Sequence, residues 1–220
     1  MKLTLFDLDH TLLNGDSDVL WCDFLIKQGV LEHASFAARN ADMEERYQAG
    51  TVGLEEFANF YVGTLAGRTR RDWEPLRQEF LATTIVPRIG PAALDLVNRH
   101  LDAADLVVMT TATNRFITEL TALYFGIEHL IATEPQMEDG RFTGRTTGTL
   151  NMREGKVTRL HDWLRGAGHR FKDFDSTAYS DSINDLPLLK AVQRAIAVNP
   201  DARLHAKAEA RGWPILRLKH

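Results

Sequence analysis

The chain starts with an apolar run, Leu3–Phe6, which leads directly into two acidic residues and a hydroxyl, Asp7, Asp9 and Thr11. A short apolar run of this kind is typical of a buried strand. A charged side chain is costly inside a sheet but is tolerated where a strand ends, and ligands of open α/β sheets bind at that edge. The pattern therefore predicts a strand with a catalytic metal site at its carboxyl end.

The stretch after this strand has helical periodicity and no convincing strand. Apolar residues recur at helical spacing in its first segment, as at Val19, Leu20, Phe24 and Leu25. Several glycines interrupt the periodicity and Pro87 closes it, so about four helices are expected. We expect a small helical cap domain over residues 15–87, inserted into a core domain made of residues 1–14 and 88–220.

From residue 94 onward, helical segments and short apolar segments alternate. The expected strands are Leu106–Thr110, Leu130–Thr133, Thr177–Ser180, Ala195–Val198 and Ile215–Leu218. The expected helices are Phe116–Tyr124, Lys156–Arg165 and Asp185–Ala191. Asp139-Gly140 lies between two β-prone stretches and predicts a hairpin turn. Alternation of this kind predicts an α/β fold with a Rossmann-like parallel sheet and right-handed crossovers.

The composition changes this picture little, because 44% of the 220 residues are apolar and 25% are charged, as in ordinary globular proteins. The net charge of -4 is spread over interspersed acids and bases, so we expect no nucleic-acid partner. No apolar run reaches membrane-spanning length, and we expect no membrane partner. The single cysteine, Cys22, cannot form an internal disulfide, which predicts a reducing, cytoplasmic setting. The sequence does not determine the oligomeric state.

Three later segments repeat the arrangement of the first, with polar groups just beyond an apolar strand. Residues 106–114 end in hydroxyls and an amide directly before a helix, where free N–H groups suit a phosphate. Lys156, at the start of a helix, can point its ammonium toward an anionic centre. Asp181 and Asp185, four residues apart after a strand, can lie on one side of a helix start. We expect these groups to meet Asp7 at one edge of the sheet.

Each of these elements also has a simple structural alternative when it is taken alone. Asp9 could cap a turn and Asp181 could cap a helix. An isolated lysine is usually a surface residue. The order of the four segments therefore carries the argument, and no single segment does. His10, inside the first motif, is expected to be a packing residue near the site.

The order of these motifs resembles that of the haloacid dehalogenase superfamily of phosphatases. It consists of Asp-x-Asp-x-Thr at residues 7–11, a threonine after a strand, a lysine, and then Asp-x-x-x-Asp at residues 181–185. The resemblance spans essentially the whole chain. The helical segment after the first motif is similar to that superfamily's first type of cap (C1). Within the superfamily, the chain is most similar to subfamily IB, the branch with phosphoserine phosphatase and histidinol phosphatase.

The resemblance implies a mechanism in which Asp7 attacks phosphorus and forms an aspartyl-phosphate intermediate. Mg²⁺ would be held by Asp7, the backbone carbonyl of Asp9 and Asp181. Asp9 would protonate the departing alcohol and later deprotonate the attacking water. Thr111 and Lys156 would bind the phosphoryl oxygens.

Three further residues and one competing residue complete the predicted site. Asp185 would support the metal site or orient Lys156. Asn114 and Asn184 are candidates for contact near the substrate or the metal. Thr110 competes with Thr111 for the phosphoryl-binding role, and Thr111 is preferred because the family segment has two small residues after its hydroxyl residue.

The cap is expected to bind the alcohol part of the substrate. Asp16 stands where phosphoserine phosphatases carry an acidic residue that meets the substrate amine, although it could equally cap the first cap helix. Their cap arginine, which meets the substrate carboxylate, aligns here with Asn59, unless Arg46 or Arg68 replaces it. The resemblance thus implies a small-molecule phosphomonoester of an amino alcohol without a carboxylate. Histidinol phosphate is the best candidate, and phosphoserine is the alternative.

Two other activities use the same kind of site. A phosphomutase would share the nucleophile, the metal and the cap type, but the cap sequence suggests no second phosphate site. A non-catalytic sensor of phosphorylated ligands would be expected to have lost Asp7 or Asp9, and both are present. A phosphatase is therefore the activity that the motifs favour.

Overall fold

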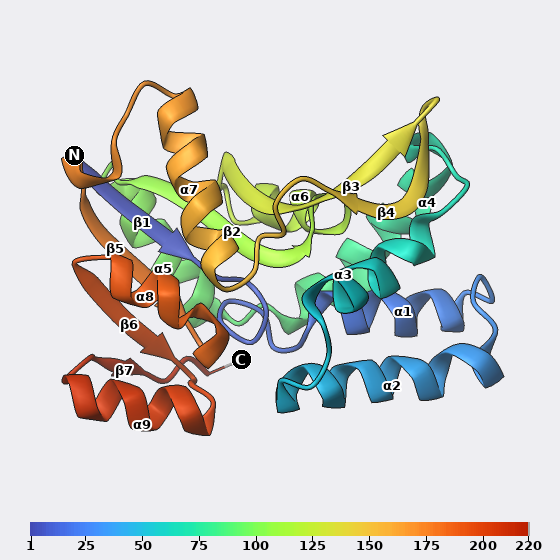
Figure 1. The fold of residues 1–220 in the computed structure, drawn as a ribbon, viewed down its shortest axis with the longest axis horizontal. Helices are drawn as coiled ribbons and strands as arrows, with labels where there is room; N and C mark the ends of the chain where they lie inside the picture. The colour runs from blue at the N-terminus through green and yellow to red at the C-terminus, as the bar shows by residue number, and fades with distance from the viewer. Residues whose placement is uncertain (220) are drawn as a thin grey trace.

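The computed structural model describes residues 1–219, the side chain of Gln48 excepted. These residues contain one seven-stranded sheet with the strand order β4-β3-β2-β1-β5-β6-β7. The strands are β1 (Lys2–Phe6), β2 (Leu106–Asn114), β3 (His129–Glu138), β4 (Arg141–Thr147), β5 (Asp175–Ser180), β6 (Arg194–Val198) and β7 (Ile215–Leu216). Every neighbouring pair is parallel except β3 and β4. The predicted α/β fold with a mostly parallel sheet is confirmed (Figure 1).

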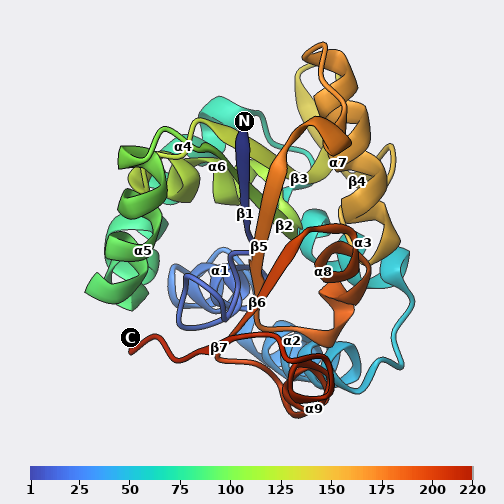
Figure 2. The ribbon, with the colours of Figure 1, turned by 90° about the vertical axis from the view of Figure 1, so that its left-hand side faces the viewer.

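Helices cover both faces of this sheet (Figure 2). One apolar cluster joins Phe6 of β1 to α5 (Pro91–Asp102) and α6 (Arg115–Tyr124). A second cluster joins Leu3 and Leu5 of β1 to three helices on the other face. These are α7 (Glu154–Gly166), α8 (Leu186–Ala191) and α9 (Ala202–Arg211). Alternate residues of β1 therefore enter separate cores, as the two-residue period of a strand requires.

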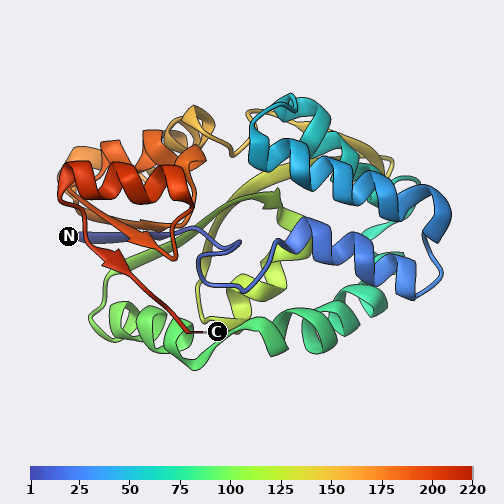
Figure 3. The ribbon, with the colours of Figure 1, turned by 90° about the horizontal axis from the view of Figure 1, so that it is seen from below.

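Four α-helices lie between β1 and α5 in the chain, and they lie beyond the carboxyl ends of the strands (Figures 1 and 3). They are α1 (Ser17–Lys27), α2 (His33–Ala49), α3 (Leu54–Val62) and α4 (Arg70–Phe80). Asp16 caps the start of α1, and Thr69 forms a capping box with Asp72 at the start of α4. Gly50 ends α2 with a φ of 73°, a left-handed conformation that glycine adopts without strain. The predicted boundaries of a cap domain at residues 15 and 87 stay a prediction.

Two strands extend further than the sequence pattern predicts. β2 continues beyond Thr110 to Asn114, because its β-branched threonines keep pairing with β3 up to an irregularity between Thr111 and Asn114. β3 continues beyond Thr133 to Glu138 and pairs there with the antiparallel strand β4. The predicted hairpin turn is present, with φ angles of 48° at Asp139 and 76° at Gly140.

The β3–β4 hairpin leaves the sheet and lies against the helical segment (Figure 1). The Gly67 N–H donates to the carbonyl oxygen of Phe142, and the Phe142 N–H donates to that of Arg68, at 2.8 and 3.0 Å. Gly144 has a φ of 83°, and a Cβ on it would lie only 3.0 Å from the Cβ of Ala66. Part of the predicted core domain therefore packs closely on the helices of the predicted cap.

Within the described residues, no single helix is both long and apolar enough to cross a membrane. Only a pair of helical segments, Arg70–Arg88 and Pro91–Asp102, reaches the necessary length and composition together, and this pair is bent by 99°.

Two glycines of α7 provide a test of how tightly its first turn is packed. A Cβ on Gly155 would overlap the carbonyl oxygen of Leu150, whereas a Cβ on Gly166 would meet open space. We expect Gly155→Ala to lower the free energy of unfolding by about 1–3 kcal/mol, the usual range for overpacking. Gly166→Ala should leave it unchanged or raise it by up to about 1 kcal/mol, because alanine favours helix. Urea denaturation of both variants measures the difference, and equal stabilities would contradict the packing described here.

Candidate active site

A cavity of about 470 Å³ lies between the carboxyl ends of the strands and the helical segment. The strands and the loops that follow them contribute Asp7, Asp9, Thr113, Lys156, Asp181 and Asp185 to its lining. The helical segment contributes Asp16, Glu44, Tyr47 and Phe57. The cavity therefore brings together residues from all four sequence motifs, from two helices of the predicted cap and from the N-cap of a third.

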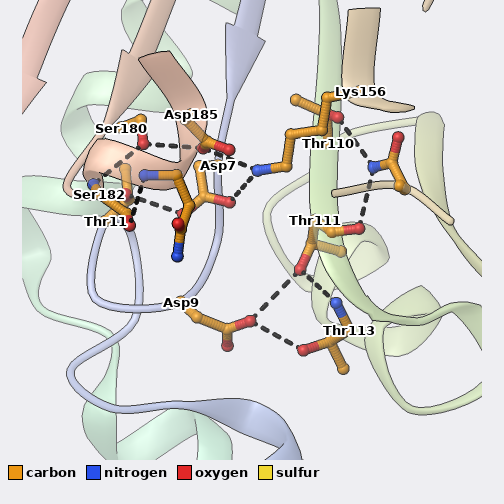
Figure 4. A network of polar contacts seen from close by, with 12 residues as sticks. Asp7, Asp9, Thr11, Thr110, Thr111, Thr113, Lys156, Ser180, Ser182 and Asp185 are labelled. Carbon is orange, nitrogen blue, oxygen red and sulfur yellow. Dashed lines mark hydrogen bonds and ion pairs between the residues drawn. The ribbon is translucent and has the colours of Figure 1, made fainter. Parts of the chain in front are cut away.

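Lys156 is the only lysine in the cavity lining among the described residues, and it lies between two carboxylates. Its Nζ donates to Oδ1 of Asp7 and to Oδ2 of Asp185, both at 2.7 Å (Figure 4). Burial by itself lowers the pKa of Lys156, but the charges of Asp185 and Asp7 outweigh burial and raise it above the ordinary value. The ammonium is therefore a permanent positive charge beside the predicted nucleophile.

Asp7 and Asp181 are linked through the hydroxyl of Thr11, which ends the first motif. The Oγ1 of Thr11 lies 3.0 Å from Oδ2 of Asp7 and 3.0 Å from Oδ1 of Asp181. The same oxygen accepts the backbone N–H of Asp181 at 3.0 Å. A hydroxyl has one proton, so it can donate to only one of the two carboxylates at a time. The pKa of Asp181 is raised by burial and by the charges of Asp7 and Asp185.

The charge of this cluster suits a divalent cation. Asp7, Asp181 and Asp185 carry three negative charges when ionised, and Lys156 neutralises one. Carboxylate and carbonyl oxygens are the ligands that Mg²⁺ prefers. Within residues 1–219, no group of three or more His, Cys, Asp or Glu side chains is placed to hold a metal. The predicted set of Mg²⁺ ligands does not require such a group of three side chains, because it combines two carboxylates with the backbone carbonyl of Asp9.

Asp9 joins the end of β1 to the start of α1 and to β2. Its Oδ1 accepts the N–H and the hydroxyl of Ser17 at 2.7 and 2.6 Å. Its Oδ2 accepts the hydroxyls of Thr113 and Thr111 at 2.9 and 3.3 Å. These donors hold the carboxylate at the junction of the sheet and the helical segment, where it faces the cavity.

The three threonines of β2 have different surroundings. Neither Thr110 nor Thr111 lines the cavity. The hydroxyl of Thr110 accepts Nδ2 of Asn151 at 3.0 Å, whereas Thr111 is fully buried beside Asp9 and its hydroxyl also accepts the N–H of Thr113. Of the two, Thr111 is the one that contacts Asp9, and its phosphoryl-binding role stays a prediction. Thr113, which the sequence analysis missed, contacts Asp9 and does line the cavity. Alternation along a strand places Thr111 and Thr113 on one face, a signal that the sequence contained.

Asp16 caps α1 and also lines the cavity. Its Oδ1 accepts the N–H groups of Asp18 and Val19 at 2.9 and 3.1 Å. Burial, then the charges of Asp9 and Glu44, raise its pKa to about 8, so without a bound cation the carboxyl is mostly protonated at pH 7. A bound ammonium would favour the ionised form, and the role of Asp16 in meeting a substrate amine stays a prediction.

Two predicted asparagines do not reach the cavity. Asn59 was expected near the substrate, but its Oδ1 accepts the N–H and hydroxyl of Thr146 at 2.9 and 3.1 Å, which ties α3 to β4. Asn114 is buried at the start of α6, where its Oδ1 accepts the N–H of Ile117 at 3.3 Å. Neither amide lines the cavity, because each is already used by neighbouring groups, and a role of either residue near the substrate stays a prediction. Asn184 does line the cavity.

The arginines of the cavity are also not those considered from the sequence. Arg46 pairs with Glu56, and Arg68 lies over the ring of Trp73, 4.4 Å from its centroid. Neither lines the cavity, whereas Arg153 and Arg203 do so on the side of the sheet.

Two other residues of the motif loops also differ from expectation. His10 was expected to pack, but it is exposed at the cavity and has a φ of 56°. Asn151 had no predicted role, yet its Nδ2 contacts Thr110 and the carbonyl oxygens of Thr111 and Ile131. Asn151 therefore ties the loop before Lys156 to β2 and β3.

Comparison with known proteins places this site in a family. Residues 4–190 match the haloacid dehalogenase-like hydrolases. Over 220 residues the chain is 40% identical to a histidinol-phosphatase of Neisseria meningitidis serogroup C, and the match covers 99% of each chain.

Solved structures agree with this match. A Bordetella pertussis protein of unknown function has a TM-score of 0.93 and 47% identity, with coverage of 98% of this chain and 97% of that one. A substrate-bound phosphoserine phosphatase has a TM-score of 0.70 at 19% identity, with coverage of 98% and 92%, so it shows the shared fold. The match over most of the chain and the near-complete overlap with the Neisseria protein show that the chain belongs to the haloacid dehalogenase-like hydrolase family.

Proposed function

We propose that this hydrolase is a Mg²⁺-dependent phosphomonoesterase whose substrate is histidinol phosphate. The observation that carries the proposal is the polarity of the cavity, with Lys156 at the strand ends and the carboxylates of Asp16 and Glu44 on the helices. A phosphate ester of an amino alcohol has the complementary order of charges. The 40% identity to a histidinol-phosphatase supports the same substrate.

Asp7 is the nucleophile in this proposal. One of its carboxylate oxygens forms a bond to phosphorus while the bond from phosphorus to the alcohol oxygen breaks. Lys156, 2.7 Å from Asp7, offsets the repulsion between the carboxylate and the phosphate. Asp7, Asp181 and the backbone carbonyl of Asp9 would hold Mg²⁺, which would supply further positive charge to the phosphoryl group.

Asp9 is the general acid and then the general base in this proposal. It gives a proton to the departing alcohol oxygen and then takes one from the water that attacks the aspartyl-phosphate, which releases inorganic phosphate and restores Asp7. Its hydrogen bonds to Ser17 tie this residue to the start of α1. Thr111, beside Asp9 on β2, is the proposed hydroxyl partner of a phosphoryl oxygen. Asp185 keeps Lys156 in place through its 2.7 Å contact.

Phosphoserine is the second candidate, and a specific observation favours it. Arg153 and Arg203 line the cavity and could meet a substrate carboxylate. Arg153 has a φ of 49° and a ψ of -123°, a strained backbone conformation of the kind that is found at functional sites. Both arginines come from the side of the sheet, however, and the helices that should bind the alcohol part present carboxylates.

We also propose that the chain works in the cytoplasm on a free small molecule. The buried, unpaired thiol of Cys22 supports a reducing compartment. The volume of the cavity suits a ligand of the size of a phosphorylated amino alcohol.

A substrate panel tests the proposed function. Phosphate release with Mg²⁺ is measured on histidinol phosphate, phosphoserine, phosphoethanolamine and a sugar phosphate. We expect kcat/KM for histidinol phosphate to exceed that for phosphoserine by about 100-fold, because a carboxylate beside Asp16 and Glu44 would be unpaired. Asp7→Asn should abolish release from all four esters. A preference for phosphoserine would instead assign Arg153 and Arg203 to the carboxylate.

Asp16→Asn tests recognition of the substrate amine. Asparagine caps a helix as well as aspartate does, so α1 should keep its stability while the carboxyl that a bound ammonium would ionise is lost. We expect kcat/KM for histidinol phosphate to fall about 10- to 100-fold, the effect of losing one charged hydrogen bond. The value for glycerol phosphate, which has no amine, should stay unchanged. An equal loss on both esters would mean that Asp16 does not bind the amine.

Removal of the metal tests whether the Asp7–Asp181 cluster binds Mg²⁺. Protein treated with a chelator should release no phosphate until Mg²⁺ is added. Saturating Mg²⁺ should also raise the Tm by about 5–10 °C, because it binds only the folded state. Asp181→Asn should lose this rise, whereas Asp162→Asn, on an exposed face of α7, should keep it. The same rise in Asp181→Asn would argue that Mg²⁺ binds elsewhere.

A further inference from the structure

Tyr47 extends from the predicted cap into the cavity. It lies near the end of α2, one helical turn after Glu44, and both residues line the cavity. Its ring stacks on that of Phe57 of α3, with 4.0 Å between centroids and 23° between planes. Phe57 is buried, so the stacking holds the Tyr47 ring in one orientation between two helices. The chain therefore presents a fixed phenol to the cavity.

The Tyr47 side chain is half-buried, and its hydroxyl forms no hydrogen bond with the groups that the structure describes. It is not one of the enclosed unpaired polar atoms, so the hydroxyl is open to a ligand. Tyr61, in the same cluster of cap residues, also has an unpaired hydroxyl, but it is fully enclosed and does not line the cavity. Only the Tyr47 hydroxyl of these two is therefore accessible to a bound molecule.

Tyr47 lines the same cavity as Asp7, Lys156 and Asp185. Lys156 holds Asp7 and Asp185 at 2.7 Å each, so a phosphoryl group bound at Asp7 would lie in the cavity that Tyr47 lines. Burial raises the pKa of Tyr47, so its phenol is protonated at neutral pH and can act as a donor.

The donors that line this cavity differ between its two sides. Lys156, Thr113, Arg153 and Arg203 can donate from the side of the sheet. The helical segment contributes Asp16, Glu44, Tyr47 and Phe57, and of these four the Tyr47 hydroxyl is the one donor when the carboxyls are ionised. A phosphate monoester has three terminal oxygens that share its negative charge, and one directed toward the helices needs a donor from that side.

We propose that the Tyr47 hydroxyl donates a hydrogen bond to a phosphoryl oxygen of the bound ester, which makes Tyr47 a catalytic residue supplied by the predicted cap. This inference rests on the proposed phosphomonoesterase activity but not on the identity of the alcohol. Because the contact is to the phosphoryl group, it serves every ester that the cavity accepts. It also makes the position of α2 and α3 over the strand ends part of the site at which phosphate is transferred.

The test compares Tyr47→Phe with Tyr61→Phe in the full chain with Mg²⁺. Each variant removes one unpaired hydroxyl from the same group of helices and keeps the ring. We expect Tyr47→Phe to lower kcat/KM about 10- to 100-fold on histidinol phosphate, phosphoethanolamine and p-nitrophenyl phosphate alike. The inhibition constant of inorganic phosphate should rise by a similar factor. Tyr61→Phe should stay within about twofold of the wild type in both measurements.

Three outcomes would overturn the assignment. The first is unchanged kinetics in Tyr47→Phe. The second is an equal loss of activity in Tyr61→Phe, which would indicate a packing effect. The third is a loss restricted to histidinol phosphate, which would mean that Tyr47 contacts the alcohol. Failure of the proposed substrate is distinguishable, because the wild type would then ignore histidinol phosphate while Tyr47→Phe still lost activity on the other esters. Thermal unfolding of both variants confirms that they are folded.

Discussion

A lysine ammonium buried between two carboxylates is the interaction on which the rest of the site depends. Lys156 is almost inaccessible to water, and Asp7 and Asp185 are the partners that make its burial tolerable. The contact joins β1, α7 and the segment after β5, so it fixes three parts of the chain at one point. It also leaves the remaining charge of the cluster negative, which is the condition for a divalent cation to bind.

Local packing explains why the lysine arrives at that point. Gly155 lets the first turn of α7 approach the backbone of Leu150, and Asn151 ties the same loop to β2 and β3. Thr11 performs the equivalent task on the other side, where its hydroxyl joins Asp7 to Asp181. These residues touch the reacting groups only indirectly, but they determine the distances between them.

The hydrogen bonds that join the sheet to the helices position the residues that we propose select the substrate. Asp9 is bonded to Ser17 at the start of α1, and the β3–β4 hairpin is bonded to α3 through Asn59. The helices are thereby held over the strand ends, where Asp16 and Tyr47 face the cavity. The same scaffold can therefore accept a different alcohol when the helices change, while the phosphoryl-transfer residues stay on the strands.

The sequence by itself determined the α/β class, the four motifs and their position at strand ends, because apolar periodicity and turn residues act over a few neighbours. The tertiary structure decided which side chains meet. Lys156 pairs with Asp7 across 149 positions, Asn59 is used by β4 instead of the cavity, and Thr111, not Thr110, faces Asp9. No sequence pattern identified Tyr47 as a site residue, because a tyrosine in a helical segment is usually a core residue. Partners far apart in the chain are selected by packing and strand register, which no local pattern contains.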